Sequence, residues 1–107
     1  MYYSVSDPRF TEQVEDFIKR KFKKEADWCN GNCYWFAHIL SSRFIELRIW
    51  YEHVEGHFLA GDFTGTVFFD WSGFRSKDSL QGIPVLWSRL QVVDPKLAKR
   101  VERDCIT

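Results

Sequence analysis

The chain has 107 residues, of which 45% are hydrophobic and 18% aromatic, so it holds enough apolar material for one compact domain and is not a disordered chain. Its 15 basic and 15 acidic residues cancel, and overall charge therefore indicates neither nucleic acid nor an acidic membrane as a partner. No apolar run approaches the roughly 18 residues of a membrane span, and no secretory leader pattern is present. We expect a single cytoplasmic domain over residues 1–107.

The first predicted element is an amphipathic helix over about residues 8–24. Asp7 followed by Pro8 is typical of an N-cap and a first helical turn. Apolar residues then recur at helical spacing: Phe10, Val14, Phe17, Ile18 and Phe22. Their common stripe predicts the face that packs on the core.

A turn rich in Asn and Gly follows at 28–32, and a second helix is predicted from there to about residue 43. Asn30 or Asn32 can cap it. Cys33 falls at its start, on the same face as several core candidates, namely Phe36, Ala37 and Leu40. The thiol is therefore expected to point inward.

The period of the apolar residues then changes to two, which predicts strands at 46–51, 56–60 and 66–71. Residues 61–65 have the composition of a hairpin turn, 72–76 end the third strand, and 76–84 are predicted as loop. A short helix at 85–90 and a last helix from Asp94-Pro95 to about 105 complete the chain. This order predicts an α+β fold, with N-terminal helices packed on a small antiparallel meander and a helical C-terminal tail.

Cys33, His57 and Asp70 form the candidate catalytic set. Backbone N–H groups and the dipole at a helix start favour a thiolate. His38 follows Cys33 by five residues and is rotated by roughly 140° along the helix, so it is a poor partner. If the hairpin turn is centred between Phe63 and Thr64, His57 lies directly opposite Asp70, and Phe58 opposite Phe69 on the other face. Cys33 would then be the nucleophile, His57 the base and Asp70 its orienter.

Other roles for these residues stay open. The first candidate for the oxyanion donor is the backbone N–H of Cys33, and the side chain of Asn30 or Asn32 is a second candidate besides its capping role. Trp28 and Trp35 flank the cysteine as candidate walls of a cleft, whereas Trp50, Trp71 and Trp87 are core candidates. The alternative chemistry is a structural zinc site built from C-x3-C and H-x3-H pairs, namely Cys29, Cys33, His53 and His57. Each residue of the catalytic set could also have a purely structural role.

Three segments carry a family resemblance: Gly31-Asn32-Cys33, Gly56-His57-Phe58 and Phe69-Asp70-Trp71. In this order the chain resembles the papain-like cysteine hydrolases, most of all the compact transglutaminase-like and NlpC-type cores, and is similar to small bacterial and phage proteins with a Gly-Asn-Cys helix start. The resemblance implies hydrolysis or acyl transfer at an amide, peptide or isopeptide bond of a peptide or protein substrate, without a metal or cofactor. The alternatives are a non-catalytic interaction or inhibitor protein with the same fold, encoded by a phage or mobile element, and a zinc-stabilised binding module.

Overall fold

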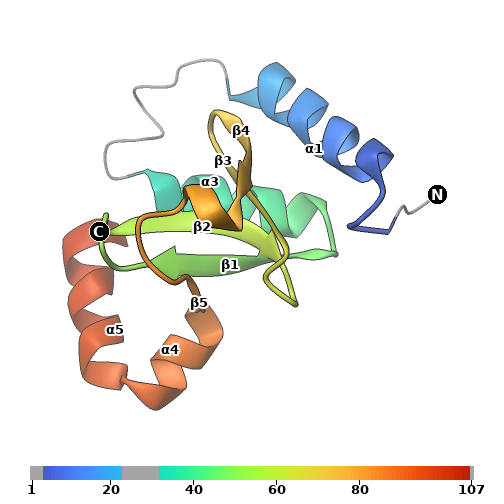
Figure 1. The fold of residues 1–107 in the computed structure, drawn as a ribbon. Helices are drawn as coiled ribbons and strands as arrows, with labels where there is room; N and C mark the ends of the chain where they lie inside the picture. Colours follow the sequence, from blue (N-terminus) through green and yellow to red (C-terminus); the bar gives the residue numbers. More distant parts are fainter. Residues whose placement is uncertain (1–3, 23–31, 107) are drawn as a thin grey trace.

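The computed structural model describes residues 4–22 and 32–106 (Figure 1). Its elements in chain order are α1 (Pro8–Lys21), α3 (Cys33–Arg43), β1 (Leu47–Glu52), β2 (His57–Asp62), β3 (Val67–Asp70), β4 (Gly73–Ser76), the 3-10 turn η1 (Lys77–Ser79), β5 (Val85–Leu86), α4 (Trp87–Val93), α5 (Pro95–Val101) and the π-helical turn η2 (Glu102–Ile106). This is an α+β fold, so the predicted fold class is confirmed. In the ranges that the structure describes, no helix is long and apolar enough to cross a membrane.

The strands form one antiparallel sheet in the order β4-β3-β2-β1-β5. Two predictions for its edges are wrong. Residues 73–76 form the edge strand β4, because Asp70 pairs with Gly73 across a two-residue turn. Residues 85–86 extend the other edge by pairing with Trp50 and Tyr51, and the helix predicted over 85–90 instead runs from Trp87 to Val93.

Helices cover one face of the sheet. Phe10, Phe36 and Leu40 from α1 and α3 pack with Ala60 and Phe69, and the cluster continues across α4 and α5 at the other end of this face. The opposite face carries Trp50, Leu59 and Phe68, over which the chain after β4 folds with Leu80 and Leu86. Figure 1 shows this arrangement, with α3 behind β1 and β2 and the segment from η1 to β5 in front of them.

The predicted helix starts at Asp7 and Asp94 are confirmed. The Asp7 carboxylate accepts a hydrogen bond from the backbone N–H of Arg9 at 2.9 Å, and Asp94 accepts one from Leu97 at 3.2 Å. Each is followed by a proline in the first turn. Asn32 occupies the N-cap position of α3, but within the described residues its side chain makes no capping hydrogen bond.

The hairpin of β2 and β3 is shifted by two residues from the predicted register. Phe69 lies opposite Ala60 and not opposite Phe58, so direct pairing of His57 with Asp70 is wrong. The turn is centred between Thr64 and Gly65, one residue later than predicted, and Asp62 holds it there because its carboxylate accepts hydrogen bonds from the N–H groups of Thr66 at 2.6 Å and Val67 at 2.8 Å. A shift of two residues keeps every side chain on its predicted face.

Candidate functional site

Cys33 lies at the first residue of α3, where the sequence predicts it, and is only 5% exposed. It belongs to a hydrophobic cluster on the helix-covered face of the sheet together with Phe58, Ala37, Tyr51, Trp87 and Leu90. The ring of Tyr34, the next residue of α3, lies 5.2 Å from the ring of Phe58. The start of α3 therefore packs against the β2 residue that directly follows His57.

His57 lies on the opposite face of the same strand. Successive side chains of a strand point to opposite faces, and Phe58 points toward the helices. His57 is the first residue of β2 and pairs with Glu52 of β1. Its Nε2 lies 3.9 Å from Oδ2 of Asp70. The two-residue shift thus makes His57 and Asp70 diagonal neighbours on one face, and the structure brings these two predicted residues together.

The sheet separates this pair from the predicted nucleophile. Cys33 and His57 lie at the same end of β2, but Cys33 packs on the helix-covered face and His57 on the face covered by the chain after β4. Proton transfer needs donor and acceptor within about 3 Å, or one water between them. In the described residues, His57 and Asp70 therefore share one face of the sheet, and Cys33 packs on the other.

Asp70 makes the contacts of a turn-forming residue, which is the structural role that the sequence left open for it. It is 4% exposed, and its Oδ1 accepts hydrogen bonds from the backbone N–H of Ser72 at 2.8 Å and from the Ser72 hydroxyl at 2.5 Å. Its Oδ2 forms an ion pair with Nη1 of Arg75 at 2.6 Å. His57 at 3.9 Å is beyond hydrogen-bond distance from the same oxygen. Asp70 is first of all the carboxylate that closes the turn between β3 and β4.

Arg75 is the site residue that sequence reasoning missed. It lies in β4 opposite Phe68, which places it on the face of Asp70 and His57. The guanidinium also donates to the hydroxyl and the carbonyl oxygen of Ser79 at 3.1 Å each, so its position is fixed from both sides. Strand periodicity would have placed Arg75 on this face, had the sequence revealed that 73–76 form a strand.

Burial lowers the pKa of His57 below its ordinary value of 6.5. The carboxylates of Asp70, Glu55 and Glu52 act in the opposite direction, and the charge of Arg75 lowers the pKa further. His57 is therefore neutral at pH 7, with one ring nitrogen able to donate a hydrogen bond and the other able to accept one.

These side chains surround a pocket of about 350 Å³ lined by Glu55, His57, Asp70, Trp71, Ser72 and Arg75. Its volume is within the range of small-ligand sites. Trp71, which the sequence places in the core, is partly exposed here. The pocket combines a neutral imidazole, carboxylates, a fixed guanidinium, a hydroxyl and an indole.

The other predicted residues lie away from this pocket or outside the described ranges. Trp28, Cys29 and Asn30 are in the latter group, and the described Asn32 is exposed at the start of α3. Trp35 is 44% exposed on α3, where its ring lies 5.1 Å from that of Tyr34. Within residues 4–22 and 32–106, no group of three His, Cys, Asp or Glu side chains is arranged for a metal ion.

Comparison with protein-family models, curated proteins and solved structures finds no match. Fold and site define a small α+β domain with a polar pocket at one end of its sheet. Its function is therefore argued from the geometry of that pocket.

Proposed function

We propose that this domain is a non-catalytic binding protein whose ligand occupies the pocket of His57, Asp70 and Arg75. The observation that carries the proposal is the position of Cys33, in an apolar cluster across the sheet from His57. A buried cysteine among aromatic side chains acts as a small hydrophobic residue. His57, the base that a Cys33 nucleophile would use, lies on the other face of β2 with Asp70.

Binding follows from groups that are held in place before the ligand arrives. Arg75 and Asp70 fix one another, so neither loses much conformational freedom on binding. Neutral His57 and the Ser72 hydroxyl supply donors and acceptors, and Glu55 supplies a carboxylate at the rim. The pocket lining is mostly polar, and the indole of Trp71 is its one large apolar surface.

The reactivity of Cys33 tests this proposal. Iodoacetamide labelling with peptide mapping measures the rate at Cys33 at mildly acidic pH, with glutathione as the reference thiol. We expect Cys33 to react more slowly than glutathione, because it is buried, and the His57→Gln variant to react at the same rate as the wild type. If Cys33 reacts faster than glutathione, and the substitution slows it by about tenfold or more, the thiol is coupled to His57 and the proposal is wrong.

A cysteine hydrolase acting on amide, peptide or isopeptide bonds is the second candidate. It is favoured by the pair of His57 and Asp70 and by the position of Cys33 at a helix start. In that reaction the Cys33 thiolate attacks the carbonyl carbon, His57 protonates the leaving amine, and water then releases the acyl group. The candidate requires Cys33 and His57 to reach one face of the sheet, and the labelling experiment decides between the two functions.

A further inference from the structure

The tip of the β3–β4 hairpin, residues 70–75, forms one wall of the His57 pocket. Four of the six residues that line the pocket belong to this tip, namely Asp70, Trp71, Ser72 and Arg75. The sheet does not fix the distance from the tip to His57, because β3 pairs with β2 only through two residues that precede the tip, Phe68 and Phe69. The two strands of the hairpin pair with one another at four positions, as far as the turn. The tip is therefore a closed unit that extends beyond its last strand pair with β2.

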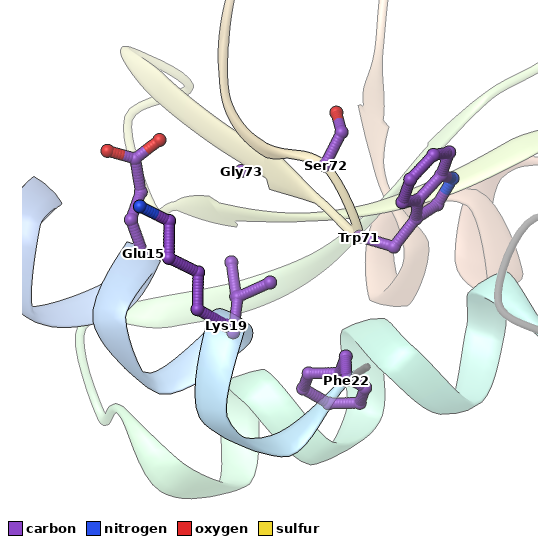
Figure 2. Close-up of a pocket in the computed structure, with 7 residues that line it drawn as sticks. Glu15, Lys19, Phe22, Trp71, Ser72 and Gly73 are labelled. Atoms are coloured by element: carbon purple, nitrogen blue, oxygen red, sulfur yellow. The ribbon is translucent and has the colours of Figure 1, made fainter. Parts of the chain in front are cut away.

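A second cavity separates this tip from α1, on the opposite face of the hairpin. Its volume is about 450 Å³, and Trp71, Ser72 and Gly73 line it on the tip side. Figure 2 shows these residues across the cavity from Glu15 and Lys19 of α1. Because there is space on both faces of the tip, a small number of contacts decides where it stands. One of these contacts is the packing of Trp71 against the core cluster of α1 and α3.

Glu15 of α1 supplies another contact, across the second cavity. Its Oε2 accepts a hydrogen bond from the backbone N–H of Phe74 at 3.0 Å. This approach is possible because Gly73 has no side chain, since a Cβ at that position would lie 2.6 Å from the same oxygen. Gly73 also has a φ of 115°, which favours glycine. The hairpin thus has a glycine at the point where the carboxylate of α1 reaches its backbone.

The Phe74 backbone is linked to the groups that face His57. Arg75 directly follows Phe74, and its Nη1 lies 2.6 Å from Oδ2 of Asp70. The same oxygen lies 3.9 Å from Nε2 of His57. We propose that Glu15 is a positioning residue of the His57 pocket, which holds the Phe74 N–H and thereby sets the distance from the Asp70–Arg75 pair to His57. Glu15 acts through the hairpin and does not itself line this pocket. The inference rests on the proposed binding function, because it concerns the same pocket.

The imidazole titration of His57, followed by NMR on the full chain, reports where the tip stands. Burial lowers the pKa of His57, the carboxylates of Asp70, Glu55 and Glu52 raise it, and the charge of Arg75 lowers it. If the tip loosens, water reaches the ring and the pKa rises toward 6.5, because burial is the largest of these effects. Asp70 and Arg75 move together, so their opposite effects on the pKa partly cancel.

Three substitutions of Glu15 separate its contact from its charge. Glu15→Ala removes the contact, and Glu15→Asp keeps the charge but is one methylene shorter, so it no longer reaches the Phe74 N–H. For both variants we expect the ratio of protonated to neutral His57 at a fixed pH to rise about twofold or more. Glu15→Gln loses the charge but keeps an acceptor oxygen at the same reach, so it should titrate like the wild type. Glu15 belongs to none of the core clusters, so these variants are expected to fold.

Asp16→Ala is the matched control, because it removes a carboxylate that is 73% exposed from the next position of α1 and should leave the His57 titration unchanged. The inference is overturned if neither Glu15→Ala nor Glu15→Asp raises the protonated fraction of His57, since Glu15 is then only a structural contact. It is also overturned if Glu15→Gln or Asp16→Ala raises that fraction as much as Glu15→Ala does, since charge and not position then acts on His57. None of these outcomes touches the binding function itself, which the labelling rate of Cys33 tests separately.

Discussion

Replacing Asp70 by Asn tests whether this carboxylate holds the β3–β4 hairpin. Asp70 is buried and accepts hydrogen bonds from the Ser72 N–H and hydroxyl and from the Arg75 guanidinium. Asn keeps the shape but turns one acceptor oxygen into an NH2 group. That group then faces either Arg75 or Ser72, and the negative charge opposite Arg75 is lost.

The magnitude follows from these contacts. A hydrogen bond to a charged group contributes about 1.5–3 kcal/mol and one between neutral groups about 0.5–1.5 kcal/mol. Breaking a fully buried ion pair costs about 3–5 kcal/mol, but the Arg75 side chain is 27% exposed and water can solvate part of its charge. We therefore expect Asp70→Asn to lower the free energy of unfolding by about 2 kcal/mol, since the three contacts share one carboxylate.

Urea denaturation followed by far-UV circular dichroism measures this loss as a lower midpoint at an unchanged m-value. Asp78→Asn, at an exposed position of η1, is the matched control and should change nothing. The double variant with Arg75→Met should lose less unfolding free energy than the two single variants lose together, because both substitutions remove the same ion pair. A loss under about 0.5 kcal/mol for Asp70→Asn would refute the reasoning, because a surface carboxylate behaves in this way.

Three further predictions concern neighbouring groups. Burial alone would raise the pKa of Asp62, but hydrogen bonds from Thr64, Val67 and Thr66 lower it below 3.8. The ionised carboxylate therefore stabilises the folded protein above pH 3.8, and this stabilisation is lost as the pH falls through the pKa that Asp62 has in the folded state. Urea midpoints of the wild type should fall more steeply below about pH 4 than those of Asp62→Asn, and parallel curves would contradict this. The pKa of His57 is also lowered in the folded state, so stability should decrease as the pH falls below 6.5, and His57→Gln should flatten the midpoint curve from that pH down to the folded pKa. Cys33→Ala should cost about 1 kcal/mol against about 3–5 kcal/mol for Phe58→Ala, measured by urea denaturation, because it removes one buried atom and not a ring; equal losses would show that the thiol makes more than packing contacts.

The order of elements and the helix starts could be predicted because their signals are local. Asp7 and Asp94 each precede a proline and apolar residues at helical spacing. The capping hydrogen bond forms within the first helical turn and needs no distant contact. The β4 strand could not be predicted in the same way. Its four residues carry no alternation, and they extend because Asp70 folds the turn back and Glu15 binds the N–H of Phe74.

The hairpin register depended on a side chain that propensity does not describe. The prediction centred the turn between Phe63 and Thr64. In the structure its centre lies one residue later, where the Asp62 carboxylate accepts hydrogen bonds from the N–H groups of Thr66 and Val67. His57 and Asp70 still lie together on one face because the shift is an even number of residues. An odd shift would have placed the two side chains on opposite faces.

The alternation of side chains along β2 explains why Cys33 and His57 are separated, although their order in the chain matches that of a thiol enzyme. Residues 58–60 are fully buried, so β2 has apolar side chains on both faces and its sequence does not indicate which face a helix covers. The small side chains of Ala37 and Ala60, both fully buried, lie on the side that α3 covers. Phe58 shares that face with Cys33, and His57, one residue earlier, is left with Asp70 and Arg75 in the polar pocket. Spacing along a chain places residues on elements, but packing decides which face each one shares, and here packing places His57 with Asp70 and Arg75 and away from Cys33.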